Sequence, residues 1–313
     1  MPENRALEAL FKSGVADPAA PTLFVRARYH PALDAFQRLD CHQTCRLQAD
    51  HLPGICEPNP PYETCLYLGT QQRQENLWNF ARCLNWLAPG GHFWCTMPNE
   101  LGAARYEKEL KKAGLAVVSH SLRKSRVFGC AKAEAPAEWL AMGEPGRREH
   151  GFVSRPGVYG WDKIDKGSQL LVSCFPEVME GEVADLGSGY GYLAAKVPGG
   201  RVHLYESERL ALDCARENVP AAASFHWADV TRDLPSQAFD WVVTNPPFHQ
   251  GKAESLETGL KFITEAARAL RPGGRIMLVA NQHLPYEEAL DTFYVSWREV
   301  KRTNAYKILE ARK

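Results

Sequence analysis

Residues 182–193 read EVADLGSGYGYL, a short β-type run that leads into a turn with three glycines. The following segment, YLAAKV (192–197), is expected to open a helix. Glycines at such a turn let the backbone bend tightly and let a ligand approach its N–H groups. Structural turns use glycine too, so the motif gains meaning from its surroundings. It predicts the first strand–turn–helix unit of a ligand-binding α/β sheet.

The chain after this turn alternates between strand and helix patterns. This alternation predicts a parallel, doubly wound sheet, closed by a C-terminal antiparallel hairpin. Strands are expected at 201–206, 223–230, 239–245 and 275–281, helices at 208–219 and 256–274, and the hairpin at 295–312.

The first half of the chain resembles a weaker copy of the second. Residues 83–100 line up with 266–283 as a helix, a Pro-Gly-Gly stop and a strand, and 116–133 echo the terminal hairpin. Residues 22–33 are the third match, since they lie where a first strand and its turn would fall. Three matches in the same order favour a tandem duplication. The predicted fold is two Rossmann-like α/β domains. Their predicted boundaries are a degenerate domain at 1–135, a linker at 136–156 with a short helix around Trp139, and a catalytic domain at 157–313.

Composition narrows the class of protein. The chain is 45% hydrophobic and 24% charged, which is ordinary for globular domains. It contains no run of the roughly 20 apolar residues that a membrane span needs and no secretory signal at the start. We therefore expect a cytoplasmic protein with no membrane partner and with its nine cysteines reduced. Lys+Arg and Asp+Glu balance at 37 each, so bulk charge does not reveal a nucleic-acid partner.

Three acidic residues stand at the ends of predicted strands. Asp185 precedes the glycines, in a D-x-G-x-G-x-G spacing that differs from the dinucleotide pattern and suits a cationic ligand such as S-adenosylmethionine. Glu206 ends the next strand, where an acid can accept hydrogen bonds from ribose hydroxyls. Asp229 is placed to bond an adenine amino group, although for this residue on its own an N-cap or turn role is slightly favoured.

The fourth predicted strand, FDWVVTN, runs into the sequence NPPF at 245–248. Prolines stop strands well, and that role alone would explain the pair. Ligands of open α/β sheets nevertheless bind at the carboxyl ends of strands, where three other suitable residues already lie. The segment therefore completes a candidate site.

Together, DLGSGYG, Glu206, Asp229 and NPPF resemble class I S-adenosylmethionine-dependent methyltransferases that act on nitrogen conjugated to a planar system. The stretches 157–173, 245–251 and 280–290 are similar to the ribosomal RNA guanine-N2 methyltransferases, particularly the small-subunit methyltransferase C type. That family is itself a tandem duplication with one catalytic copy, the C-terminal one. The resemblance implies a cofactor site made of Asp185, Gly187, Gly189, Gly191, Glu206 and Asp229, with Asp165, Gly167 and Gln169 helping to close it.

The same resemblance assigns substrate roles to the NPPF segment. The Asn245 side-chain oxygen and the Pro246 carbonyl are expected to accept hydrogen bonds from an amino group, and Pro247 to hold the backbone rigid. Phe248 is expected to stack on the base. His249 is expected to contact a phosphate or to be a plain polar loop residue.

The expected reaction is methyl transfer from S-adenosylmethionine to guanosine N2 of small-subunit (16S) ribosomal RNA, yielding S-adenosylhomocysteine. The expected protein is a monomer that acts on RNA within the small subunit and needs no metal. The alternatives are the same chemistry on large-subunit (23S) RNA, transfer to adenine N6 or glutamine N5, and a non-catalytic RNA-binding assembly factor.

Two further sequence features bear on these expectations. The N-terminal copy has RARYHPAL (26–33) where the glycines should lie and TQQRQ (70–74) where NPPF should lie, so it is expected to support RNA docking or structure rather than catalysis. The cluster Cys41, His42, Cys45, His51 and Cys56 lacks a C-x₂-C zinc knuckle, and plain thiols are the default interpretation.

Overall fold

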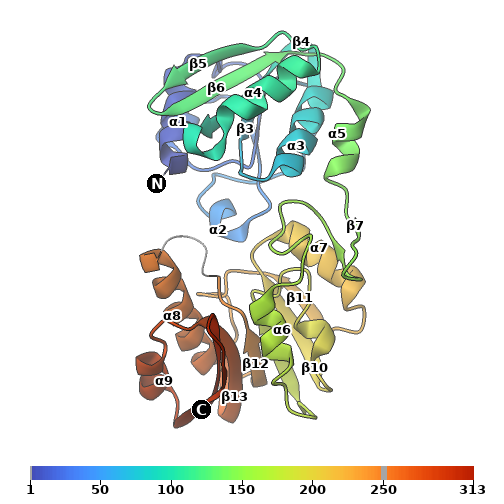
Figure 1. The fold of residues 1–313 in the computed structure, drawn as a ribbon. Helices are drawn as coiled ribbons and strands as arrows, with labels where there is room; N and C mark the ends of the chain where they lie inside the picture. The colour runs from blue at the N-terminus through green and yellow to red at the C-terminus, as the bar shows by residue number, and fades with distance from the viewer. Residues whose placement is uncertain (1, 248–251) are drawn as a thin grey trace. The chain divides into compact units, whose positions relative to one another are not determined.

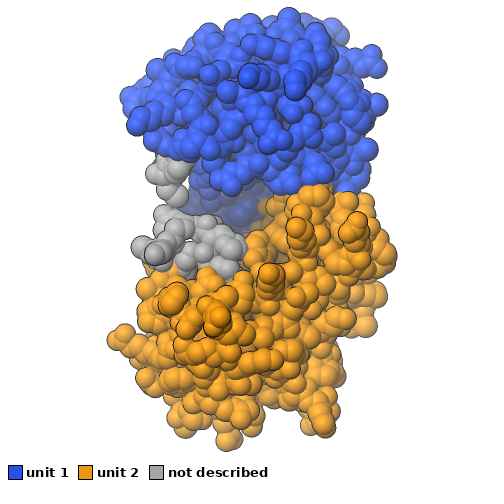
Figure 2. All heavy atoms as spheres, in the orientation of Figure 1, with its two compact units in different colours: residues 1–144 blue, residues 145–313 orange. Residues whose placement is uncertain are grey.

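The computed structural model describes residues 2–247 and 252–313. The chain divides into two compact units, residues 1–144 (unit 1) and 145–313 (unit 2), which Figure 2 colours separately. Each unit is a layered α/β structure built on its own sheet (Figure 1). Among the described residues, every helix is too short or too polar to cross a bilayer.

Within the described part of unit 2, seven strands form one sheet in the order β11-β10-β9-β12-β13-β15-β14. The first five strands of this order are parallel, and β15 is antiparallel to both of its neighbours. The predicted parallel sheet and its terminal hairpin are thereby confirmed. The strands are β9 (Glu182–Leu186), β10 (Arg201–Glu206), β11 (Ser224–Trp227), β12 (Phe239–Thr244), β13 (Leu270–Asn281), β14 (Ser296–Arg302) and β15 (Tyr306–Arg312).

Both faces of this sheet are covered, because successive side chains of its central strands alternate between two apolar clusters. Val242 and Ile276 join the cluster formed with α8 (Lys252–Ala269) and α9 (Glu287–Phe293). Val243 and Met277 join the opposite cluster, to which α6 (Lys166–Val172) contributes Leu171. A fourth helix, α7 (Arg209–Asn218), packs against β10 and β11 (Figure 1).

One expected element of unit 2 is wrong. The segment YLAAKV does not open an α-helix; it forms a single 3₁₀ turn, η3 (Ala194–Lys196). After Val197 come Pro198, Gly199 and Gly200, and both residue types stop helices, so the turn does not propagate into an α-helix.

Unit 1 repeats this plan with a smaller sheet. Over residues 2–144, six strands follow the order β2-β1-β3-β4-β6-β5, again parallel except for β6, which is antiparallel to both neighbours. This order matches that of unit 2 without a counterpart of β11. The elements are α1 (Pro2–Lys12), β1 (Thr22–Val25), η1 (Pro31–Ala35), β2 (Leu39–His42), α2 (Arg46–Ala49), β3 (Tyr62–Leu68), α3 (Arg73–Trp86), β4 (Leu87–Pro98), η2 (Asn99–Leu101), α4 (Ala103–Lys112), β5 (Val118–Leu122) and β6 (Ser125–Ala131).

The segment predicted to be a linker, 136–156, contains ordered elements. Helix α5 (Ala137–Met142) buries Trp139 in the core of unit 1, against Phe80 of α3. The strands β7 (Gly146–Arg147) and β8 (Val153–Ser154) pair with each other inside unit 2. The short helix expected around Trp139 is therefore present, and it belongs to unit 1.

Candidate active site

The candidate site lies at the carboxyl edge of the unit 2 sheet. Strands β9, β10, β11 and β12 are parallel, so their carboxyl ends meet at one edge. Gly187 directly follows β9, and Glu206 is the last residue of β10. Asp229 lies two residues beyond the end of β11, and Asn245 directly follows β12. The parallel pairing explains why residues about 60 positions apart in sequence come together.

The three loop glycines all adopt left-handed backbone, with φ of +71° at Gly187, +55° at Gly189 and +87° at Gly191. Their surroundings differ. A Cβ at Gly189 would meet nothing within 4 Å, whereas one at Gly191 would come within 2.9 Å of Val219, next to α7. Gly189 therefore leaves open space beside the loop, and Gly191 serves close packing between the loop and α7.

Asp185 is fully buried at the end of β9. One carboxylate oxygen accepts a hydrogen bond from the Ala194 N–H at 2.9 Å, and the other has no hydrogen-bond partner among the described residues. Burial, and secondarily the nearby charge of Glu206, raises the pKa of Asp185 to about 7. An unsatisfied buried carboxylate of this kind favours a cationic ligand.

Glu206 and Asp229 already hold the loops around the site. Glu206 accepts from the Gly189 N–H at 2.7 Å and from the Glu208 N–H at 2.8 Å, and burial raises its pKa. Asp229 accepts from the Thr231 N–H at 2.9 Å and from the Thr231 hydroxyl at 2.8 Å. The turn role considered for Asp229 is thus present in the structure.

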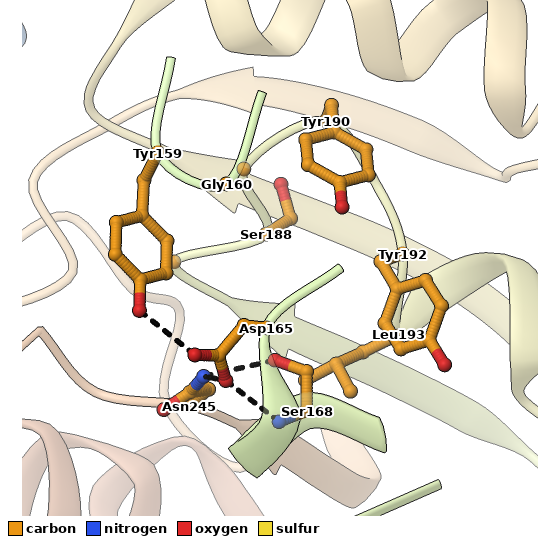
Figure 3. A pocket seen from close by; sticks show the side chains of 11 residues that line it. Tyr159, Gly160, Asp165, Ser168, Ser188, Tyr190, Tyr192, Leu193 and Asn245 are labelled. Atoms are coloured by element: carbon orange, nitrogen blue, oxygen red, sulfur yellow. Dashed lines mark hydrogen bonds between the residues drawn. The ribbon is translucent and has the colours of Figure 1, made fainter. Parts of the chain in front are cut away.

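Asn245 is held by two residues near the start of α6 (Figure 3). Its Nδ2 donates to Asp165 Oδ1 at 2.9 Å and to Ser168 Oγ at 2.8 Å. Asp165 is the N-cap of α6, accepting from the Ser168 N–H at 2.8 Å, and its other oxygen accepts from the Tyr159 hydroxyl at 2.9 Å. The Asn245 Oδ1 is buried and finds no hydrogen-bond partner in the described chain.

A pocket connects the glycine loop with this network. Of the predicted residues, the described part of its wall includes Asp165, Gly187, Gly189 and Asn245. The wall also holds residues that the sequence motifs did not single out: Tyr159, Gly160, Ser168, Ser188, Tyr190, Tyr192 and Leu193. All but Tyr192 and Leu193 lie within 157–173 or 185–191, the stretches that carried the resemblance, so for these residues only the individual roles were missed.

Other predicted residues lie around the pocket rather than in its described wall. Gly167 is buried, and a Cβ there would approach Asp165, Tyr306 and Val279 at 3.0–3.3 Å, so it permits close packing of α6. Gln169 is exposed on α6. Pro246 is buried and Pro247 exposed, while Phe248 and His249 lie outside the described residues.

The Cys/His cluster of unit 1 does not assemble a metal centre in this structure. Within residues 2–247 and 252–313, no three His, Cys, Asp or Glu side chains are grouped so as to hold an ion. All nine cysteines are free thiols. Burial raises the pKa of Cys41 to about 12, which keeps this thiol protonated in the free protein.

The residues at the carboxyl edge of unit 2 fit an S-adenosylmethionine-like ligand. Asp185 Oδ1 and Ser188 Oγ are buried polar atoms with no hydrogen-bond partner in the residues described. Gly189 adds open space beside backbone N–H groups, which a ligand can occupy. These features suit such a molecule, because its cationic part needs a free acceptor. Its polar groups can use the free hydroxyl and the open space beside the loop.

The strand order of unit 2 and the residues at its strand ends define a class I methyltransferase fold. The sequence model of the methyltransferase small domain family matches residues 149–310. This match covers more than half of the chain, and the protein belongs to that family.

Similar proteins agree with this placement. Ribosomal RNA small subunit methyltransferase C of Photorhabdus laumondii is 28% identical over 265 residues, covering 80% of this chain and 77% of the relative. Ribosomal RNA large subunit methyltransferase G of Shewanella amazonensis is 32% identical, covering 52% of this chain and 46% of the relative. The fold matches the 16S rRNA guanosine-N2 methyltransferase of T. thermophilus, solved with AdoMet and guanosine, at a TM-score of 0.82 and 24% identity, covering 98% and 91% of the two chains.

Proposed function

We propose that unit 2 transfers a methyl group from S-adenosylmethionine to the exocyclic N2 of a guanosine in 16S ribosomal RNA. The proposal includes action in the cytoplasm, as a monomer, on RNA within the small ribosomal subunit. Unit 1, whose strand ends lack the cofactor motif, is proposed to dock RNA and to support unit 2.

The buried, unpartnered Oδ1 of Asn245 is the observation that carries this proposal. The exocyclic amino group of guanine is a poor nucleophile, because its lone pair is delocalised into the ring. An acceptor that binds one amino hydrogen orients the lone pair of the nitrogen and stabilises the positive charge that develops on this atom. A buried oxygen without a partner costs about 1–3 kcal/mol, so binding the amino group also relieves a cost already present in the fold.

The proline pair makes this acceptor rigid. Pro246 is buried directly after Asn245, and its ring fixes φ near −65°, which limits movement of the Asn245 backbone. The Pro246 carbonyl is proposed as the second acceptor for the amino group. Two fixed acceptors define the direction from which the nitrogen lone pair approaches the methyl carbon.

S-adenosylmethionine, when bound, supplies an electrophilic methyl group and leaves as S-adenosylhomocysteine. Asp185 is proposed to bind the cationic methionine end, with Gly187, Gly189 and Gly191 shaping the loop around it. Glu206 is proposed to accept from the ribose and Asp229 from the adenine amino group, each from a position that its loop contacts already fix.

The choice of RNA draws on the relatives. Three proteins named small subunit methyltransferase C match along 78–80% of this chain, whereas the large subunit methyltransferase G and four other small subunit methyltransferase C proteins match about half of it. The longest of these matches favour small-subunit RNA. Transfer to 23S RNA by the same site is the second candidate.

The test is methylation in vitro by the purified protein, with labelled S-adenosylmethionine and with 16S RNA, 23S RNA or whole small subunits as acceptors. Nucleoside mass spectrometry of the product is expected to give N2-methylguanosine in 16S RNA. The same nucleoside in 23S RNA alone would establish the second candidate. Methyladenosine, or no methylated nucleoside, would overturn the proposal.

A further inference from the structure

The Asn245 carboxamide uses both of its hydrogens inside the protein. Its Nδ2 atom lies 2.9 Å from Asp165 Oδ1 and 2.8 Å from Ser168 Oγ, and an amide nitrogen has two hydrogens to donate. The oxygen of the same group is buried without a partner in the described residues. The side chain therefore presents an acceptor, and no donor, to the pocket.

The opposite orientation of the carboxamide is disfavoured by Asp165. An ionised carboxylate only accepts hydrogen bonds, and Asp165 already accepts from the Ser168 N–H and the Tyr159 hydroxyl. A flipped Asn245 would place its oxygen against this carboxylate and leave both Nδ2 hydrogens facing the pocket. The contacts consequently fix which end of the amide faces a ligand.

We infer that Asp165 and Ser168 act as positioning residues that hold Asn245 with its oxygen toward the pocket, so that the site selects a nucleophile bearing hydrogen. This pair is called the amide clamp below. The inference rests on the proposed function, because it assigns Asn245 the amino group as its partner. It gives Asp165 a role that acts through Asn245. The sequence resemblance had instead implied that Asp165 helps to close the cofactor site.

The clamp predicts a preference that is measurable without catalysis. Guanosine has the exocyclic amino group and inosine lacks it, while the rest of the two bases is alike. In the presence of S-adenosylhomocysteine, the wild-type protein is expected to bind a guanosine-containing RNA about tenfold more tightly than its inosine analogue, since losing one hydrogen bond to a buried group costs about that factor. Ser168→Ala is expected to reduce this preference to less than about threefold, because one of the two contacts that hold the amide is lost.

Variants of Asp165 test the clamp from its other side, with a capping variant in unit 1 as the control for helix capping. Asp165→Asn keeps an acceptor for both the Ser168 N–H and Asn245, and is expected to retain most of the guanosine preference. Asp165→Ala is expected to abolish the preference and to lower kcat while the S-adenosylmethionine Kd stays within about threefold of wild type. Gln72→Ala removes the side-chain cap of α3 in unit 1, where Gln72 accepts from two backbone N–H groups, and controls for stability lost with a cap.

Two readouts distinguish failure of the clamp from failure of the proposed function. If wild type methylates no RNA and shows no base preference, the proposed function fails, and the clamp is then judged from the Asn245 side-chain NH₂ signals in NMR, assigned by their loss in Asn245→Ala. The clamp requires those protons to exchange slowly in wild type and at least about tenfold faster in Ser168→Ala, because hydrogen-bonded amides are protected from exchange. Unchanged exchange in Ser168→Ala would overturn the clamp, as would weakened S-adenosylmethionine binding in that variant with the guanosine preference intact.

Discussion

Each unit has an asparagine near the carboxyl end of one central strand, β3 in unit 1 and β12 in unit 2. The side-chain amides of these two asparagines differ in their hydrogen bonds. In unit 1, Asn76 Oδ1 accepts from the Tyr67 hydroxyl at 2.8 Å and from the Thr70 N–H at 2.9 Å, and Asn76 Nδ2 donates to the Thr70 carbonyl at 2.7 Å. In unit 2, only the side-chain nitrogen of Asn245 has hydrogen-bond partners among the described residues. The first carboxamide stabilises a loop, and the second leaves an acceptor for a ligand.

The turns after the first strands differ in the same way. β1 ends at Val25 and β9 at Leu186, and the next residue of each chain segment has left-handed backbone: Arg26 with φ +53° and Gly187 with φ +71°. The Arg26 guanidinium donates to the Leu68 carbonyl at 3.1 Å and lies 3.8 Å from a Glu75 carboxylate oxygen. Unit 1 thus keeps the backbone of the turn and adds a side chain that contacts the end of β3.

These differences show how one fold serves two purposes. Unit 1 joins its polar groups near the ends of β1 and β3 to one another, which favours stability. Unit 2 leaves Asp185, Ser188 and Asn245 each with a buried polar atom that has no partner in the described chain. Such atoms cost stability in the free protein, and we propose that they are the atoms that a bound ligand satisfies.

Breaking the contrast at the two asparagines gives the largest expected effect. Asn245→Ala is expected to lower kcat for methyl transfer by about 10²–10³-fold, because it removes a preorganised acceptor for the reacting amino group. Calorimetry is expected to show cofactor binding within a few-fold of wild type. Near-normal turnover would reject the role of Asn245.

The matched change in unit 1 is Asn76→Ala. It leaves the Tyr67 hydroxyl and the Thr70 N–H without their acceptor, so the free energy of unfolding is expected to fall by about 1–3 kcal/mol. Turnover per folded molecule is expected to stay near wild type. A large loss of kcat in a fully folded Asn76→Ala protein would contradict the division of roles between the units.

The next largest effect is expected at the glycine loop. Gly187→Ala puts a Cβ at a left-handed position, 3.3 Å from the Phe262 ring, and is expected to weaken S-adenosylmethionine binding at least about tenfold in calorimetry. Gly14→Ala is the control, since Gly14 has the same φ of +71° and no atom within 4 Å of its Cβ position. Equal cofactor affinity in the two variants would show that the loop does not contact the cofactor.

The sequence was sufficient for the parallel sheet with its antiparallel hairpin and for the strand-end residues, because both follow from local patterns. Alternating strand and helix signals imply parallel strands, and parallel strands bring their carboxyl ends together. For this reason Gly187, Gly189 and Asn245 could be assigned to one site although Asn245 is distant in sequence. The helix expected at YLAAKV failed because apolar spacing says little about how far a helix propagates before Pro198.

The contacts between side chains could not be predicted in the same way. The Tyr159–Asp165–Asn245 connection depends on how α6 is docked on the sheet, which is a tertiary feature with no local pattern. Gln169 was assigned to the pocket with Asp165, but its side chain is exposed on α6 and lies outside the described pocket wall. The partner of each Asn245 atom likewise emerges only from the folded geometry.

A smaller and pH-dependent effect is expected at Asp185. Its pKa of about 7 in the folded protein lies above the ordinary value, so the folded state retains a proton that the unfolded chain loses between about pH 4 and pH 7. Stability therefore falls as pH rises through this window. Asp185→Asn is expected to raise the free energy of unfolding at pH 8 by an amount of order 1–2 kcal/mol and to leave it nearly unchanged at pH 4.

Thermal unfolding at the two pH values tests this, with S-adenosylmethionine binding as the second readout. The cofactor cation favours ionised Asp185, so its affinity is expected to rise with pH from 6 to 8 in wild type and to be weak and pH-independent in Asp185→Asn. The buried-carboxylate interpretation would be contradicted if Asp185→Asn gained less stability over wild type at pH 8 than at pH 4.

The smallest effect is expected at Arg26, where the contrast between the two turns can be reversed. Arg26→Gly relieves a left-handed arginine but loses the contact with Leu68, and we expect these terms to cancel to within about 1 kcal/mol in chemical unfolding. Arg123 provides the control, since it has the same φ of +53° in the exposed β5–β6 turn, and Arg123→Gly is expected to be mildly stabilising. Cofactor stoichiometry is expected to remain one per chain, because the apolar Phe24 stands in unit 1 where Asp185 stands in unit 2. Combining Arg26→Gly with Gly187→Ala weakens the contribution of unit 2. Tighter cofactor binding in this double variant than in Gly187→Ala alone would show that the arginine side chain alone had closed a functional site in unit 1.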